Sequence, residues 1–122
     1  MAAVTPGSHS APASTVIVLT TVPADRDGVA IGRQLVEEGL AACVSVLPPM
    51  VSVYRWQGEV HQDMERQLVI KTRAERVEAL MARLTTLHPY DVPECLVLPV
   101  AGGSDAYLAW VRDSVAPLDP RP

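Results

Sequence analysis

The sequence predicts an α+β domain in which two helices lie on one face of an antiparallel sheet. Apolar, β-branched runs alternate with amphipathic segments in the order strand, helix, strand, strand, helix, strand, and one further helix follows. Two βαβ-like halves with right-handed crossovers give a four-stranded sheet. This is the ferredoxin-like βαββαβ sandwich. Its second sheet face would carry Val, Tyr and Trp without cover, which predicts self-association.

The chain length and composition are typical of one domain. The chain has 122 residues, of which 48% are hydrophobic and only 4% aromatic, with no Phe, so we expect an aliphatic core. The small, polar, proline-bearing residues 1–14 are expected to form a flexible N-terminal tail. Residues 15–115 should form the ferredoxin-like domain, and the proline-rich residues 116–122 a C-terminal tail.

The charge balance excludes several classes of partner. Ten basic residues against 14 acidic ones give a net charge of −4, which argues against nucleic acid and against an anionic membrane surface. No apolar run approaches the ~18 residues of a membrane span. Residues 1–14 contain no Lys or Arg, so they do not form a secretory signal. The two cysteines are too few for a disulfide framework, and we expect a cytoplasmic protein.

The first half of the chain predicts a strand, a helix and a second strand. The run 15–22 is apolar on both faces, as in a central strand. Asp25 is the expected N-cap of a helix that reaches about Glu38, with Gly39 as its stop. Two glycines inside that helix, Gly28 and Gly32, predict close packing on the sheet. The second strand is expected over 40–47.

The middle of the chain predicts a long β arm. Residues 50–56 alternate, with Met50, Ser52, Tyr54 and Trp56 on one face. Gln57-Gly58 is typical of a tight turn. The polar stretch 60–65 is expected to be exposed or irregular, and 67–71 returns as a strand. An arm of this length has little of its own chain to lie on, so we expect it to be shared with another subunit.

The second half predicts two helices around an edge strand. Thr72-Arg73-Ala74-Glu75 matches a capping box, and the helix after it carries an amphipathic stripe that ends at His88. The strand 95–100 contains Pro99 near its end, as edge strands do. Ser104 is expected to cap a last helix. The stripe comprises Val77, Leu80, Met81, Leu84 and Leu87; the buried side of the last helix is expected to comprise Tyr107, Leu108, Trp110, Val111 and Val115.

The connector from His88 to Glu94 concentrates polar groups around two prolines. Pro89 disfavours helical geometry at His88, and Pro93 fixes a second backbone angle. A stiff connector holds polar side chains in place at low entropic cost. The alternative is simple punctuation, a helix stop followed by a strand start.

Three residues form a candidate metal site: Cys43, His88 and Glu94. Thiolate and imidazole suit copper or zinc, and a carboxylate can fill a third position. The alternatives are that Cys43 is a small core residue and that the His88 ring bonds a carbonyl or a carboxylate across a subunit boundary. No organic cofactor is expected, because neither a Walker loop nor a dinucleotide fingerprint is present.

A second candidate site is an inter-subunit cleft. We expect Trp56, Glu65, Lys71 and Tyr90 to line it with His88 and Glu94, and Cys43 is a further candidate. Lys71 could pair with Glu65 or Glu94, and such a cluster could bind an anion or a small ligand. The alternative is a structural ion pair at the interface, with Tyr54 and Trp56 as interface packing and Trp110 in the core.

An enzyme is not expected. A cysteine hydrolase that uses Cys43 and His88 would need an orienting third group and an oxyanion site, and the sequence shows neither pattern.

Six fragments, in order, resemble the CutA family of divalent-cation tolerance proteins. The resemblance covers about residues 15–115, and one departure is Asp91, where the family usually has Glu. The fragments are Leu40-Ala41-Ala42-Cys43-Val44, Tyr54-Arg55-Trp56-Gln57-Gly58, Asp63-Met64-Glu65, Ile70-Lys71-Thr72, His88-Pro89-Tyr90-Asp91-Val92-Pro93-Glu94 and Tyr107-Leu108-Ala109-Trp110.

This resemblance implies a tight homotrimer whose strands pair across subunits, with an architecture like that of PII-type signalling trimers. The family is linked to tolerance of copper and other divalent metals, and in animals to the anchoring of membrane proteins. The expected function is therefore a cytoplasmic homotrimer that binds divalent metal, copper foremost, in inter-subunit clefts. The alternative is a PII-like regulatory or scaffolding trimer that binds a small ligand or a partner protein without catalysis.

Overall fold

The computed structural model describes residues 14–116. The predicted tails 1–14 and 116–122 lie outside the described residues, except for Ser14 and Ala116. The order of elements over 14–116 is β1 Thr15–Pro23, α1 Gly28–Glu37, β2 Cys43–Val46, β3 Met50–Trp56, β4 Glu59–Arg73, the 3₁₀ helix η2 Ala74–Arg76, α2 Val77–Leu87, β5 Leu96–Pro99 and α3 Asp105–Ser114.

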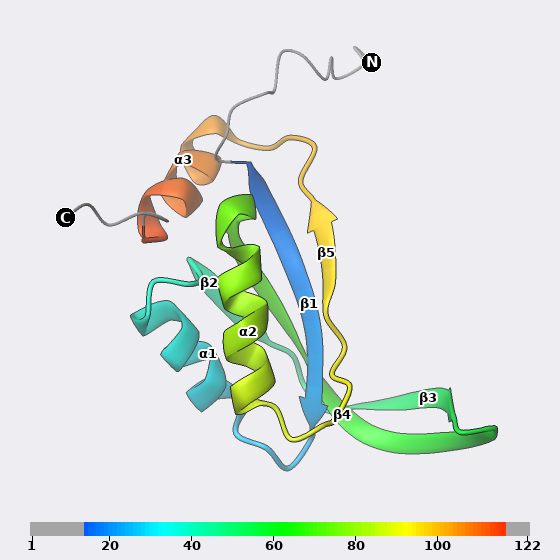
Figure 1. The fold of residues 1–122 in the computed structure, drawn as a ribbon. Coiled ribbons are helices and arrows are strands. Elements are labelled where there is room, and N and C mark those ends of the chain that lie inside the picture. The colour runs from blue at the N-terminus through cyan, green and yellow to red at the C-terminus, as the bar shows by residue number, and fades with distance from the viewer. Residues whose placement is uncertain (1–13, 117–122) are drawn as a thin grey trace.

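One antiparallel sheet organises the described residues. Its strand order is β2-β4-β1-β5, and β3 pairs with β4 beyond that path. The longest pairing joins β1 to β4, from Thr15 opposite Arg73 to Pro23 opposite Glu65. Helices α1 and α2 cover one face, and α3 lies at one end of the sheet (Figure 1). The predicted α+β fold with an antiparallel sheet is confirmed, but the sheet has five strands where the sequence predicted four, because β3 pairs with the extended part of β4.

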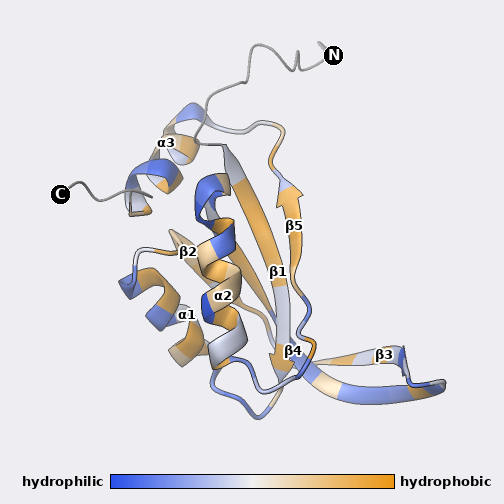
Figure 2. Cartoon of the chain, viewed as in Figure 1, coloured by the Kyte–Doolittle hydropathy of each residue, from blue (hydrophilic) through white to orange (hydrophobic). Residues whose placement is uncertain are grey.

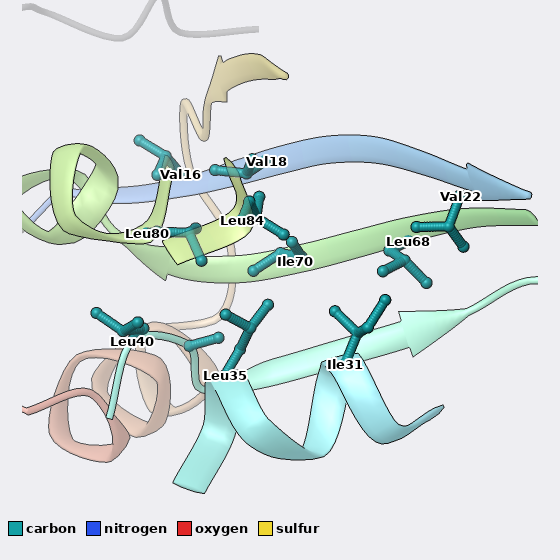
Figure 3. Close-up of a cluster of buried hydrophobic side chains, with 11 residues drawn as sticks. Val16, Val18, Val22, Ile31, Leu35, Leu40, Leu68, Ile70, Leu80 and Leu84 are labelled. Atoms are coloured by element: carbon teal, nitrogen blue, oxygen red, sulfur yellow. The ribbon is translucent and has the colours of Figure 1, made fainter. Parts of the chain in front are cut away.

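The core lies between the sheet and these two helices, and it is aliphatic as expected. Leu35 from α1, Leu68 and Ile70 from β4 and Leu80 from α2 are fully buried there (Figure 3). The whole buried cluster is Val16, Val18, Val22, Ile31, Leu35, Leu40, Ala41, Leu68, Ile70, Leu80 and Leu84. A Cβ at Gly32 would stand 3.0 Å from Val44 Cγ1, so the predicted close packing of this helix on the sheet is confirmed.

The β3–β4 arm leaves the body of the sheet (Figure 1). Its turn is as predicted, because Gln57 and Gly58 both have positive φ, 50° and 81°. Residues 60–65 were expected to be exposed or irregular; most of them are exposed, but they are regular, since β4 runs unbroken from Glu59 to Arg73. The reason is backbone pairing: Met50 to Trp56 pair with Glu65 to Glu59, and this pairing satisfies the backbone whatever the side-chain polarity.

Two predicted caps were wrong. The N-cap of α1 is Asp27, whose Oδ1 accepts the Ala30 N–H at 2.9 Å, rather than Asp25. The capping box at Thr72 does not form, because Thr72 stays in β4 and its hydroxyl donates to the Leu40 carbonyl at 2.7 Å. A 3₁₀ turn then leads into α2. The Gly39 stop is confirmed by its φ of 76°, and α2 ends at Leu87 with His88 as its C-cap, as predicted.

The second strand is shorter than predicted. β2 covers only Cys43–Val46, and the predicted strand residues Leu40, Ala41 and Ala42 are instead buried in the connection that precedes it. Strand β5, by contrast, is the edge strand that Pro99 predicted. Figure 2 shows β5 as largely hydrophobic, and its Leu96 is 54% exposed.

Helix packing also differs from the predicted stripes. In α2, Leu80 and Leu84 are buried, but Met81 is exposed. In α3, Ser104 caps the helix by accepting the Tyr107 N–H at 3.2 Å, as predicted, yet Tyr107 and Trp110 are exposed. The prediction that Trp110 belongs to the core was wrong because α3 packs only at the end of the sheet, where Val111 and Val115 meet Ala42.

Within residues 14–116 we find no helix that is both long enough and apolar enough to span a bilayer.

Candidate functional site

A pocket of about 780 Å³ lies along the β3–β4 arm, from Glu65 at its base to Trp56 near its turn. It forms where the arm, the end of β1 and the connector between α2 and β5 meet. Its volume falls in the range of small-molecule sites, roughly 300–1,000 Å³. The lining residues are Thr21, Ser52, Val53, Tyr54, Trp56, Glu65, Pro89, Tyr90, Asp91, Val92, Pro93 and Glu94.

His88 holds the connector in place. Its buried ring joins β1 through a hydrogen bond between Nε2 and the Thr21 carbonyl, and its Nδ1 accepts the Tyr90 N–H at 3.2 Å. Because Nδ1 accepts, Nε2 is the nitrogen that carries the proton and donates to Thr21. Both ring nitrogens are therefore used inside the chain. This agrees with the alternative in which His88 bonds a carbonyl, although that carbonyl belongs to the same chain.

Tyr90 and Glu65 form the buried polar contact of the pocket. The Tyr90 hydroxyl donates to Glu65 Oε2 at 3.0 Å, and Glu65 is only 8% exposed. Burial raises the pKa of the Tyr90 phenol well above its ordinary value, and the hydrogen bond to Glu65 raises that pKa further. Tyr90 therefore stays protonated and acts as a donor.

The pocket lining is anionic. It contains three carboxylates, Glu65, Asp91 and Glu94, and no Lys, Arg or His. Glu94 Oε2 accepts from Gln67 Nε2 at 3.4 Å. Just outside the lining, Asp63 accepts a hydrogen bond from the Tyr54 hydroxyl, and this bond raises the pKa of that phenol. A lining of this charge attracts cations.

The structure brings together only part of the predicted cleft. Trp56, Glu65 and Tyr90 line the pocket with Glu94, whereas Lys71 does not. Lys71 lies six residues beyond Glu65 on β4, a separation of about 20 Å at the rise of a strand. The predicted pairing of Lys71 with Glu65 is therefore wrong within one chain, and none of the ion pairs formed by residues 14–116 joins Lys71 to Glu94.

Lys71 instead contacts α3. Its Nζ donates to the Tyr107 hydroxyl at 3.2 Å and lies 5.5 Å from the centre of that ring. The hydrogen bond to Tyr107 raises the pKa of Lys71. Cys43 pairs with Lys71 in the β2–β4 register, and its Sγ lies 4.0 Å from Ser45 Oγ.

The candidate metal ligands are not gathered in one chain. Among residues 14–116 there is no group of three His, Cys, Asp or Glu side chains that could hold a metal ion. Cys43 stands opposite Lys71, whereas the His88 ring binds the backbone of Thr21, which stands opposite Gln67. Lys71 and Gln67 are four residues apart on β4, or about 13 Å. One copy of the chain therefore does not place Cys43, His88 and Glu94 around a single metal ion.

Sequence reasoning missed several lining residues. Asp91 stood out only as a departure from the family pattern, and Tyr54 only as packing. The alternation over 50–56 contained a usable signal, because Ser52, Tyr54 and Trp56 share one strand face and all line the pocket. The direction in which that face points depends on where the arm leaves the sheet, and no local pattern encodes this.

The antiparallel sheet with two helices on one face places the chain in the ferredoxin-like α+β class, and solved structures agree. The divalent cation tolerance protein of Thermus thermophilus superposes with a TM-score of 0.81 at 45% identity, over 84% of this chain and 99% of that one. The PII-like protein CutA from Nostoc sp. PCC 7120, solved in apo form, gives a TM-score of 0.77 at 36% identity, over 83% of this chain and 97% of that one. CutA of Synechococcus elongatus PCC7942, complexed with a Bis-Tris molecule, superposes with a TM-score of 0.76 at 41% identity, over 84% of this chain and 95% of that one.

The chain belongs to the CutA1 family of divalent ion tolerance proteins. The family model matches residues 16–114. The divalent-cation tolerance protein CutA of Thermus thermophilus is 47% identical over 98 residues, which is 80% of this chain and 95% of that protein. A chloroplastic CutA of Arabidopsis thaliana is 44% identical over 82% of this chain, which spans about 55% of that longer relative.

Proposed function

We propose that this chain acts in divalent-cation tolerance as a cytoplasmic homotrimer whose pocket is closed by a neighbouring subunit. The observation that carries the proposal is the β3–β4 arm, which lines the pocket on one side and extends beyond the sheet (Figure 1). Its Val51, Val53 and Trp56 are exposed, as are Leu96 and Leu98 on the edge strand β5. Apolar side chains along an arm and a sheet edge favour pairing with further copies of the chain.

The first proposed occupant is a divalent metal, copper foremost, or zinc. In this proposal Glu94 supplies oxygen from one subunit, and Cys43 or His88 supplies sulfur or nitrogen from another. His88 can serve only if its bond to Thr21 opens, because both of its ring nitrogens are engaged. Glu94 and Cys43 are therefore the ligands to test first.

Two measurements test this proposal. Light scattering should give a trimer mass at micromolar concentration, and a monomer mass would refute the assembly. Calorimetric titration with Cu(I), Cu(II) and Zn(II) should then show stoichiometric uptake that Glu94→Gln weakens. Glu78→Gln, on the exposed side of α2, is the control and should bind like the wild type. If Glu94→Gln alters stability alone, Glu94 is a structural partner of Gln67 instead.

A second candidate is a regulatory module that binds a small ligand without catalysis. The observation in its favour is the pocket volume of about 780 Å³, with aromatic side chains in its lining, which exceeds the space that a metal ion needs. One relative is described as PII-like, and another has been solved with a Bis-Tris molecule. A trimer that takes up no metal at micromolar concentration would leave this candidate in place of the first.

A further inference from the structure

The charge of the pocket restricts the ligands that it can bind. The ionisable side chains in its lining are two tyrosines, Tyr54 and Tyr90, and three carboxylates, Glu65, Asp91 and Glu94. A phosphate-bearing or carboxylate ligand would be repelled by all three, and the described lining contains no cationic side chain to offset this repulsion. The part of the pocket that this chain contributes therefore favours positive charge.

The Glu65 carboxylate can accept hydrogen bonds beyond the one from Tyr90. Glu65 is 8% exposed. Among residues 14–116, the one side chain that donates to it is Tyr90, whose hydroxyl bonds Glu65 Oε2. A carboxylate has two oxygens and about four acceptor positions, and a buried anion is costly while these are unmatched. The raised pKa of Tyr90 keeps it a neutral donor, so Tyr90 contributes no positive charge. A ligand with N–H donors and a positive charge would satisfy Glu65 on both counts.

The other walls of the pocket suit an organic cation better than a bare metal ion. Tyr54, Trp56 and Tyr90 contribute aromatic rings to the lining, and Val53 and Val92 add aliphatic surface. Aromatic faces attract ammonium groups, and apolar walls cover a carbon skeleton. The volume of about 780 Å³ leaves room for that skeleton.

We infer that this pocket binds a small organic ammonium ion, with Glu65 as the buried acceptor, Asp91 and Glu94 as further anionic partners, and Tyr54 and Tyr90 as aromatic walls. The inference rests on the second candidate function, a ligand-binding trimer, and names its ligand class. It requires no covalent step. A protonated amine donates hydrogen bonds to Glu65, and its carbon chain lies against the aromatic rings.

The test uses the full chain and three probes of equal chain length. They are 1,4-diaminobutane, which is a dication at neutral pH, the neutral 1,4-butanediol, and the dianion succinate. The chain has two tryptophans, so Trp110→Phe leaves Trp56 as the single tryptophan reporter, and it lies in the pocket. We expect saturable quenching or a spectral shift with the diamine, and none with the diol or succinate. Equal binding of the diol would overturn the inference, because charge would then play no part.

Variants separate the roles of the carboxylates. Glu65→Gln keeps an oxygen that can accept from Tyr90 but removes the charge, and we expect at least a roughly tenfold loss of diamine affinity. Asp91→Asn changes an exposed side chain and should fold normally, so it tests the role of charge even if Glu65→Gln folds poorly. For Asp91→Asn we expect a several-fold loss of diamine affinity. Glu78→Gln should leave the affinity unchanged. Wild-type affinity in both Glu65→Gln and Asp91→Asn would overturn the inference.

Light scattering on the same samples keeps two failures apart. A trimer that binds no diamine refutes the ammonium site and leaves the assembly intact. A monomer refutes the proposed function directly, whatever it binds. Saturation of the Trp56 signal by Zn(II) or Cu(II), with no response to the diamine, would assign the pocket to metal and overturn the inference.

Discussion

The imidazole of His88 joins the start of the connector to β1: Nε2 bonds the carbonyl of Thr21, which is 67 residues earlier, while Nδ1 accepts the N–H of Tyr90. The two bonds fix the path of the chain just before the pocket, and they direct Tyr90 toward Glu65. His88 is thus a positioning residue for the pocket, independent of any role in binding metal.

Replacement of His88 by Ala should lower the free energy of unfolding by about 1–3 kcal/mol, because a buried carbonyl and a backbone N–H lose their partner. Urea denaturation at one protein concentration measures this change. His61→Ala on the arm is the control and should have a smaller effect, since within residues 14–116 the His61 ring forms no hydrogen bond and stacks on Tyr54. Equal losses in the two variants would contradict the positioning role.

Tyr90→Phe should reduce stability by about 1 kcal/mol at neutral pH by removing the hydrogen bond to Glu65. Burial raises the folded-state pKa of this phenol above its ordinary value of 10.0, so the folded state favours the protonated form. That stabilisation is complete below about pH 10 and is lost as the pH rises toward the folded-state pKa.

The advantage of the wild type over Tyr90→Phe should therefore be constant from about pH 7 to 9 and should shrink above about pH 10. Denaturation curves at about pH 8 and pH 11 check this expectation. The other groups with a raised pKa, Tyr54, Lys71 and Cys95, titrate in both proteins and cancel in the difference. A stability difference between the wild type and Tyr90→Phe that grows at alkaline pH would refute a raised pKa of Tyr90 in the folded state.

The same substitution should have opposite effects at two buried threonines. Thr72 and Thr20 are both fully buried, but the Thr72 hydroxyl donates to the Leu40 carbonyl, whereas Thr20 Oγ1 has no partner among residues 14–116. Thr72→Val should destabilise the protein by about 1–2 kcal/mol, and Thr20→Val should be neutral or stabilising. Thermal and urea unfolding measure both. Thr72→Ser, which keeps the hydroxyl, should lose less than Thr72→Val.

Gly39→Ala should destabilise the protein by about 1–2 kcal/mol, because the φ of 76° at this position is unfavourable for an L side chain. The new Cβ would also stand 2.6 Å from Ala116 Cβ. Gly102→Ala is the matched control, since a Cβ there meets nothing within 4 Å and its φ is not in the left-handed region. Equal melting temperatures for the two variants would show that Ala116 and the backbone adjust without strain.

The sequence by itself determined the local structure, where a few neighbouring residues decide the outcome. The β-branched run at the start predicts β1, Gln57-Gly58 predicts the hairpin turn, and Gly39 and Ser104 mark a helix end and a helix start. These signals work because backbone conformation and capping depend on residues within one turn. The same locality explains the errors, since Asp25 and Asp27 are equivalent as N-caps by residue type, and only the folded chain shows that Asp27 caps the helix.

Only the tertiary structure decided which side chains share a site. The connector and the arm bring Glu94, Tyr90, Glu65 and Trp56 into the lining of one pocket, because His88 ties the connector to β1. Lys71 shares β4 with Glu65, yet the rise of a strand carries it to Tyr107 on α3 instead. Distances along a strand follow from sequence separation, but the position of the strand against a helix or an arm depends on packing over the whole sheet. That packing alone fixes the anionic pocket.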